Sequence, residues 1–268
     1  MKVSSWLNIV NHGRNQYVNM TKVVAIVQAR MGSSRLPGKP LKMILGKPAL
    51  ELLLERLSLA KNINQIVVAT SKNSEDDAIE DLCGKLGYIC FRGSSDNVLK
   101  RTSQASDSVD AEIIANITGD CILTCSEVVD EAVEYFLKHD IDYLSNLMKQ
   151  TYPQGVDIRV FRAKDLREIC NIVAKQNDVS CQEHVYLYFE ENPQDFRIHI
   201  MKAPHEFFRP EWRLDLDYEE DLKLLNIIFE DLYTRNPFFG LKELVNWLDT
   251  HPQYRSINQN MFRKPVRP

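Results

Sequence analysis

The feature that most constrains this chain is an apolar run followed at once by a basic loop. Residues 23–29 are rich in β-branched side chains, which is typical of a strand buried on both faces of a parallel sheet. Residues 30–40 combine glycines and serines with three cations. Small residues let backbone N–H groups approach an anion, and the cations match its charge. Because open α/β sheets bind ligands beyond the carboxyl ends of their strands, we expect this loop to hold a triphosphate.

Two familiar phosphate-binding motifs do not fit this loop. Five residues separate Gly32 from Gly38, where a P-loop has four, and Pro40 follows Lys39 where a P-loop has Ser or Thr. The dinucleotide fingerprint Gly-x-Gly-x-x-Gly is also absent. The alternative is a surface loop whose charges are merely solvated. Three cations directly after a buried strand favour an anion site over that alternative.

Composition narrows the class of protein. Lys and Arg number 33 against 37 Asp and Glu, a formal charge of −4, which argues against a general nucleic-acid binder. No stretch has the roughly eighteen apolar residues that a membrane span needs, and residues 1–21 lack the apolar core of a secretory signal. We therefore expect a cytoplasmic protein without a membrane partner.

The cysteines give no sign of a zinc site. None forms a Cys-x-x-Cys pair, and we expect all six to be reduced and packed as small apolar residues. They are Cys83, Cys90, Cys121, Cys125, Cys170 and Cys181.

Strand and helix patterns alternate along most of the chain. Strands are expected at residues 23–29, 65–70, 88–92, 111–118, 143–146 and 213–217. Helices are expected at residues 48–62, 74–86, 95–107, 126–139, 218–233 and 241–251. This order predicts an α/β fold, a three-layer, mostly parallel sheet with right-handed crossovers.

Three local features refine this prediction. Ser74 with Asp77 predicts a capping box, and Gly87 a helix end. In residues 150–205 the regular alternation of strand and helix patterns ends, which predicts a small inserted α+β subdomain within a single domain of residues 22–268. Residues 1–21 are expected to be a poorly ordered extension without chemistry.

Aspartates at strand ends are candidate metal ligands. Asp120 follows the strand pattern of residues 111–118, where a divalent ion would compensate a buried carboxylate; the alternative is an ordinary turn. Asp215 and Asp217 alternate with leucines and so face one side of a strand, although Asp217 also suits a helix N-cap. Oxygen ligands beside a triphosphate favour Mg²⁺ over zinc.

Several motifs together resemble one enzyme family. They are residues 28–39, 66–70, 91–94, 117–120, 152–157, 183–185 and 215–217. In order and spacing they resemble the cytidylyltransferases that make CMP-Kdo and CMP-acylneuraminate, above all the spore coat polysaccharide biosynthesis protein F type. The resemblance implies a nucleotide-diphospho-sugar transferase-like (Rossmann-like) fold that forms a homodimer through residues 150–205. It also implies Mg²⁺-dependent transfer of CMP from CTP to an acidic sugar or similar anion, with release of pyrophosphate, for surface polysaccharide biosynthesis.

The resemblance also supports roles for individual residues. The catalytic set is Arg30, Arg35, Lys39 and Asp120, with Arg35 and Lys39 on the β- and γ-phosphates and Arg30 nearer the α-phosphate. Nucleotide binding is assigned to Gln28, Ala29, Arg30, Gly32, Ser33, Arg35, Lys39, Thr70, Arg92, Gly93, Ser94, Arg101 and Gly119. Acceptor binding is assigned to Tyr152, Gly155, Asp157, Arg159, Glu183, His184 and Arg213. The metal ligands are Asp120, Asp217 and Asp215.

The acceptor remains open at this point. Arg159 stands where relatives usually carry an acidic residue, which indicates an acceptor with an extra anionic group. Two other activities are compatible with the same patterns: a glycosyltransferase that uses a nucleotide-sugar, and a nucleotide-binding subunit without catalysis.

Overall fold

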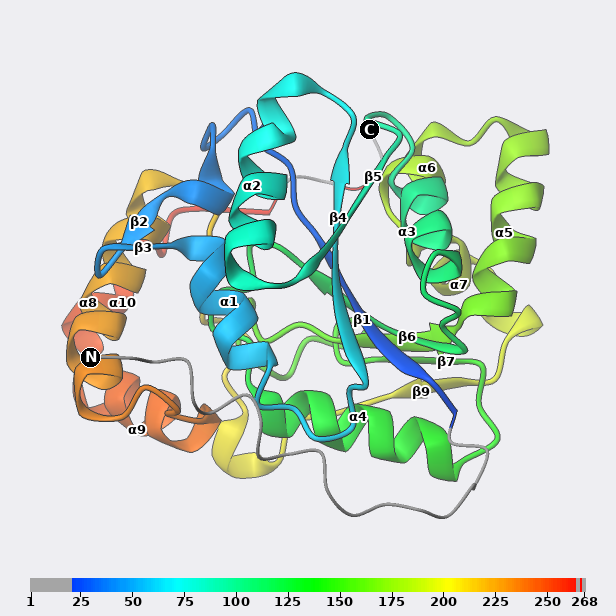
Figure 1. Ribbon diagram of the computed structural model, residues 1–268. Coiled ribbons are helices and arrows are strands. Elements are labelled where there is room, and N and C mark those ends of the chain that lie inside the picture. Colours follow the sequence, from blue (N-terminus) through cyan, green and yellow to red (C-terminus); the bar gives the residue numbers. More distant parts are fainter. Residues whose placement is uncertain (1–20, 264–265, 267–268) are drawn as a thin grey trace, which may run out of the picture.

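Seven strands form one central sheet in the order β5-β4-β1-β6-β8-β7-β9 (Figure 1). In a computed structural model of the chain, the structure describes residues 21–263 and 266. The predicted extension, apart from Thr21, lies outside the described residues. All strands of the sheet run in the same direction except β8, which is antiparallel to both β6 and β7.

The elements follow the expected alternation. The strands of the central sheet are β1 (Val23–Gln28), β4 (Gln65–Ser71), β5 (Ile89–Gly93), β6 (Ile113–Thr118), β7 (Tyr143–Ser145), β8 (Arg159–Arg162) and β9 (Ile198–Ile200), and β2 (Met43–Ile44) pairs with β3 (Lys47–Pro48). The α-helices are α1 (Ala49–Leu57), α2 (Asp77–Leu86), α3 (Val98–Asp107), α4 (Ser126–Lys138), α5 (Ala163–Gln176), α6 (Val179–Glu183), α7 (Leu187–Glu191), α8 (Glu219–Arg235), α9 (Leu241–Thr250) and α10 (Pro252–Arg255). Short 3-10 helices include η1 (Lys39–Leu41) and η2 (Ser74–Asp76).

The sheet separates two hydrophobic cores. Along β1, Val23, Ala25 and Val27 belong to one core, while Val24 and Ile26 belong to the other, because successive strand side chains point to opposite faces. Helices α1, α2, α4, α8 and α9 pack into the first core and α3, α5, α6 and α7 into the second (Figure 1). This arrangement confirms the predicted three-layer α/β fold.

Residues 150–205 extend the central sheet. Their strand β8 pairs with β6, and β9 pairs with β7, so the strands of the expected inserted subdomain are continuous with the main sheet. Helices α5, α6 and α7 from the same region cover one face of the sheet. A role of this region in dimer formation stays a prediction.

Two local predictions were wrong. Residues 213–217 form no strand: Arg213 makes one isolated bridge to Gln154, and the N–H groups of Leu214 and Leu216 donate to two different segments, at Gln154 and Asp120. The capping box at Ser74 does not form, because residues 74–76 adopt a 3-10 turn that precedes α2. The end of α2 at Gly87 was correct, since Gly87 has a φ of 79° and caps the helix in the left-handed conformation.

All six cysteines are free, as expected, and four of them are buried. Within residues 21–263, no helix is both long and apolar enough to cross a membrane.

Arg56 ties α1 to two other segments of the first core. Its side chain is buried, and its Nε and Nη1 donate to the carbonyls of Thr124 and Phe239, at 3.1 Å each. The guanidinium also lies 4.1 Å from the centroid of the Phe239 ring. A buried cation of this kind stabilises the fold only while its acceptors are in place.

We predict that Arg56→Ala lowers the free energy of unfolding by about 3 kcal/mol, because two charge-assisted hydrogen bonds and the ring contact are lost together. Urea denaturation followed by circular dichroism measures the change. The control is Arg167→Ala, which removes an exposed pair with Asp107 and should cost less than about 1 kcal/mol. Equal losses in the two variants would contradict this account of Arg56.

Candidate active site

The basic loop after β1 is held in a defined shape by a buried carboxylate. Asp76 is fully buried and accepts hydrogen bonds from the backbone N–H of Met31, at 2.7 Å, and of Ser71, at 3.1 Å. Gly38 donates to the carbonyl of Met31 at 3.0 Å and has a φ of 69°, which favours glycine. The loop therefore closes on itself and delivers Lys39 to the first position of η1.

The carboxyl ends of β1 and β6 meet at the predicted site. Gln28 pairs with Thr118 in the sheet register, and the N–H of Gly119 donates to the carbonyl of Gln28 at 2.8 Å. A Cβ on Gly119 would lie 2.6 Å from that carbonyl oxygen, so only glycine fits. This close approach places Asp120 beside the basic loop.

Lys39 joins two of the predicted metal ligands. Its Nζ lies 2.8 Å from Asp120 Oδ2 and 2.9 Å from Asp217 Oδ1, while Arg35 Nη2 lies 2.7 Å from Asp217 Oδ2. Burial favours the neutral amine, but the two carboxylates outweigh it and raise the pKa of Lys39. Burial also disfavours the Asp120 carboxylate, and Lys39 outweighs that effect and lowers its pKa. Residues assigned separately to phosphate and metal thus lie in direct contact.

Asp215 lies in a neighbouring ion-pair network. Its Oδ2 accepts from Arg263 Nε at 2.9 Å, and Arg263 Nη2 also reaches Asp157 Oδ2 at 2.6 Å. Burial raises the pKa of Asp215 to about 6, although Arg263 and Arg213 act in the opposite direction. The sequence prediction missed Arg263, which belongs to none of the motifs and stands far from Asp157 in the chain.

Arg213 and Asp221 bind the segment that carries Asp215 and Asp217 through ion pairs and hydrogen bonds. Arg213 Nη2 lies 3.3 Å from both Asp215 and Asp217, and its Nε donates to Asp221 at 3.1 Å. Asp221 also accepts the N–H groups of Asp217 and Tyr218 at 2.9 Å each. Asp217 is therefore not the N-cap of α8, and the capping carboxylate is Asp221, which the sequence prediction also missed. Arg213, predicted to bind the acceptor, is engaged with these acids.

The residues around β5 and α3 that are predicted to bind the nucleotide fall into two groups. Arg101 is buried and donates to the carbonyl of Ser94 at 2.6 Å, and Arg30 donates to the carbonyl of Ser95 at 3.3 Å. Arg30 also pairs with Glu183 of α6, one of the predicted acceptor residues. These contacts bring the basic loop, the loop after β5 and α6 together.

Arg92 does not join that group. Its guanidinium pairs with Asp77 and Glu80 of α2, at 2.5 and 2.8 Å, and donates to the carbonyls of Ser71 and Asn73. The prediction that Arg92 binds the nucleotide is not supported by this position, because its hydrogen bonds already go to α2 and the loop before it.

Other predicted nucleotide-binding residues lie around the same strand ends. Gln28 Nε2 donates to Thr102 Oγ1 at 3.0 Å, and the side chain of Thr70 is buried at the end of β4. The remaining members lie on the basic loop or at the end of β5, and they are Ala29, Gly32, Ser33 and Gly93.

Gly155 and Asp157, two of the predicted acceptor residues, lie next to Asp215. Gly155 has a φ of 93°, and a Cβ there would lie 2.6 Å from the backbone nitrogen of Asp215. This contact brings Asp157 next to Asp215. Arg159 is buried beneath Tyr186, with its guanidinium 3.7 Å from the ring centroid, and the His184 ring lies 5.8 Å from the same ring. Tyr152 is buried in the first core.

The aspartate group has the chemistry of a magnesium site without a preformed cage. Its donors are all carboxylate oxygens, and Asp215 Oδ1 is buried beside Arg213 Nη2, at 3.3 Å. Over the described part of the chain, the one group of three acidic, Cys or His side chains whose ligand atoms lie within 4.8 Å of one another is Asp178, Cys181 and Glu191. The predicted ligands Asp120, Asp217 and Asp215 therefore fit a hard cation, but cations of the protein stand between them.

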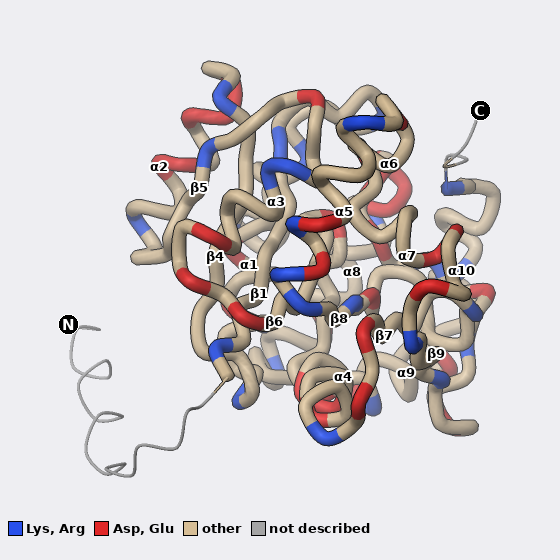
Figure 2. The backbone as a smooth tube through the Cα atoms, turned by 90° about the vertical axis from the view of Figure 1, so that its right-hand side faces the viewer, with Lys and Arg blue, Asp and Glu red and all other residues tan. Residues whose placement is uncertain are grey.

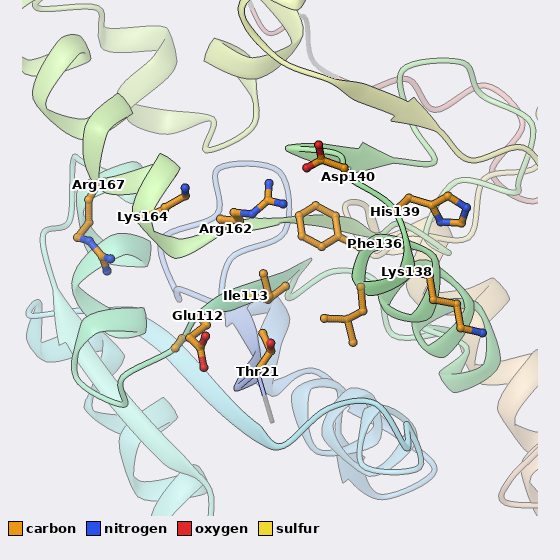
Figure 3. Close-up of a pocket in the computed structure, with 12 residues that line it drawn as sticks. Thr21, Glu112, Ile113, Phe136, Lys138, His139, Asp140, Arg162, Lys164 and Arg167 are labelled. Atoms are coloured by element: carbon orange, nitrogen blue, oxygen red, sulfur yellow. The ribbon is translucent and has the colours of Figure 1, made fainter. Parts of the chain in front are cut away.

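A separate cavity lies at the opposite ends of the strands. It has a volume of about 700 Å³ and lies between α4, the starts of β1 and β6, and the β8–α5 junction. Figure 3 shows Phe136 and Ile113 on its wall, with Arg162, Lys164 and Glu112 around them. None of the predicted site residues lines this cavity, so the candidate active site lies elsewhere in the molecule. In Figure 2 cationic and acidic positions are interspersed, in keeping with a site made of local ion pairs.

Comparison with known proteins agrees with this geometry. Residues 24–244 match the sequence model of a family described as cytidylyltransferase. The spore coat polysaccharide biosynthesis protein SpsF of Bacillus subtilis is 32% identical over 87% of this chain and 96% of its own length. An 8-amino-3,8-dideoxy-manno-octulosonate cytidylyltransferase of Shewanella frigidimarina is 34% identical over 44% of this chain and 49% of its own.

A solved structure extends the likeness to the fold. The cytidylyltransferase of Leptospira borgpetersenii superposes with a TM-score of 0.82 at 31% identity, and the match covers 91% of this chain and all of that one. The basic loop closed by Asp76, the Lys39 contact with two aspartates and these matches lead to one conclusion: the chain belongs to the cytidylyltransferase family.

Proposed function

We propose that this protein transfers CMP from CTP to a small anionic acceptor, such as an acidic sugar, in a Mg²⁺-dependent reaction that releases pyrophosphate. The observation that carries the proposal is the position of Lys39, whose ammonium lies between Asp120 and Asp217 at the end of the basic loop. Cations for a triphosphate and carboxylates for its metal thus meet at one point, as nucleotidyl transfer requires.

The reaction needs positioning and charge rather than a protein nucleophile. An acceptor oxygen attacks the α-phosphorus in line, and pyrophosphate leaves. Arg35 and Lys39 would stabilise the charge that develops on the β- and γ-phosphates, and Arg30 would lie nearer the α-phosphate. Asp120 and Asp217 would hold Mg²⁺, which supplies positive charge to the triphosphate when bound. Lys39 then exchanges a carboxylate partner for a phosphate.

An acidic acceptor is supported by the relatives and by the cations near Asp157. The Shewanella relative is named for an octulosonate, which is a sugar acid, and the Bacillus relative for polysaccharide biosynthesis. In this chain Arg263 lies 2.6 Å from Asp157, and Arg159 is near enough for Asp157 to influence its pKa. We assign this side of the aspartates to the acceptor.

The same proposal includes a cytoplasmic homodimer with residues 150–205 at its interface. Its support is the resemblance to cytidylyltransferases and the position of β9 at the edge of the sheet. Light scattering coupled to gel filtration tests it: a monomer at micromolar concentration contradicts the homodimer.

The experiment that tests the proposed function is a pyrophosphate-release assay with CTP, UTP and ATP. Each nucleotide is offered with Mg²⁺ and a panel of sugar acids, including 3-deoxy-manno-octulosonate and its 8-amino analogue. The proposal is supported if pyrophosphate is released from CTP but not from UTP or ATP, and only when one particular acceptor is present. Firm CTP binding without release from any pair would favour a non-catalytic subunit, and turnover of a nucleotide-sugar would favour a glycosyltransferase.

We predict that Lys39→Ala and Asp120→Asn each lower kcat by at least about a hundredfold, because each removes charge stabilisation at the triphosphate. The matched control is Lys42→Ala, whose ammonium pairs with exposed Glu219 and which should keep near-normal turnover. Melting temperatures of all three variants check that they fold. Near-normal rates in either site variant would show that the site is misplaced.

The position of Arg92 generates a different prediction. Since its guanidinium is bound to α2, Arg92→Ala should leave the KM for CTP within about twofold of the wild type, while Arg30→Ala raises it about tenfold or more. Steady-state kinetics at saturating acceptor measure both. A large rise in KM for Arg92→Ala would restore the original assignment.

A further inference from the structure

The segment after α10, residues 256–263, is anchored to the loop that carries the aspartates (drawn in red in Figure 1). Asn258 is buried and donates from Nδ2 to the carbonyl of Arg213, at 2.9 Å, and to Asp221 Oδ1, at 2.8 Å. Tyr218 Oη donates to the carbonyl of Phe262 at 3.3 Å. We call residues 256–263 the carboxyl-terminal strap. These hydrogen bonds fix the position of the strap and therefore limit which groups the side chain of its last residue can contact.

That side chain is Arg263, and it covers two buried acids. Its Nε donates to Asp215 at 2.9 Å and its Nη2 donates to Asp157 at 2.6 Å. The side chains of Asp215 and Asp157 are only 3% and 6% exposed, whereas that of Arg263 is 36% exposed. The guanidinium therefore forms an outer layer between two buried carboxylates and the solvent.

The same charges act on the proposed metal site. Arg263 joins Asp157 to Asp215, and Arg213 Nη2 lies 3.3 Å from both Asp215 and Asp217, a predicted metal ligand. The three carboxylates thus share one electrostatic field. Asp215 Oδ1 lies 3.3 Å from Arg213 Nη2 and its Oδ2 accepts from Arg263, so both oxygens of this acid are balanced by cations of the protein.

We propose that Arg263 is a tethered counter-ion of the active site, which balances the acidic pocket in the free enzyme and gives way when a divalent cation binds. Two cations cannot share this field without repulsion, because unit charges several ångströms apart interact strongly in a partly buried site. The strap would therefore weaken binding of free metal. This inference rests on the proposed function, because it assumes that the aspartates receive the cation.

The test measures binding of Mn²⁺ alone, without nucleotide, by electron paramagnetic resonance. Arg263→Met keeps the aliphatic stem and removes the charge, and it should bind Mn²⁺ about tenfold more tightly than the wild type. Arg263→Lys keeps the charge and should bind within about threefold of the wild type. The control for loss of a surface charge is Arg235→Met, whose partner is Asp231 on α8 and whose affinity should not change.

A second measurement uses the unmodified protein, so that it does not depend on the folding of any variant. Hydrogen exchange of residues 256–263 should become faster when Mn²⁺ is added, because the strap loses its ion pairs with Asp157 and Asp215. Exchange that is unchanged or slower contradicts the proposal.

The proposal is also wrong if Arg263→Met binds Mn²⁺ no more tightly than the wild type, including when neither protein binds it. The nucleotide assay described above is independent of this result. Release of pyrophosphate from CTP with an unaltered Mn²⁺ affinity would therefore reject the role of Arg263 and leave the transferase function intact.

Discussion

The balance of charge around three buried aspartates and the half-buried Asp120 is the constraint on which the rest of the site depends. Asp157, Asp215 and Asp217 are each at most 6% exposed, and Asp120 lies beside them. Isolated carboxylates in such surroundings would cost several kcal/mol each, so every one needs a cation or donor within reach. The fold supplies these cations from segments that are distant in sequence.

The cations come from three segments of the chain that are far apart in sequence. Lys39 and Arg35 arrive on the basic loop after β1, Arg213 on the loop before α8, and Arg263 on the carboxyl-terminal strap. The sheet brings these segments together because β1 and β6 are neighbours whose carboxyl ends coincide. A nucleotide and its metal therefore enter a site whose charges are already paired, and binding must exchange partners rather than fill an empty cavity.

The sequence was sufficient for the fold, and the family resemblance grouped residues that the structure brings into contact. Val23 to Ala29 predicted the central strand, and Lys39 and Asp120, which the resemblance assigns to one site, form an ion pair. Local patterns failed where backbone contacts with distant segments decide the conformation. Alternation at residues 213–217 predicted a strand, but the N–H groups of Leu214 and Leu216 donate to separate segments, at Gln154 and Asp120, so no ladder forms.

Two kinds of residue were beyond prediction from the sequence. Arg92 lies in a family motif, and only the structure shows that its guanidinium pairs with the acidic residues Asp77 and Glu80 of α2. Arg263 carries no local signal, because its contact with Asp215 spans 48 residues. Asp221 was missed although it contacts the N–H groups of Asp217 and Tyr218 just before it in the chain.

Asp76 illustrates how far the control of such a loop can lie from the reacting atoms. It is completely buried at the end of η2 and accepts a hydrogen bond from the N–H of Met31, 45 residues earlier. Its carboxylate is turned toward main-chain amides, so engineers who choose positions by their distance to a docked nucleotide would leave it out of their libraries. A shift of Asp76 would move the loop that begins at Met31, so this one buried residue influences the positions of all the cations that the loop carries.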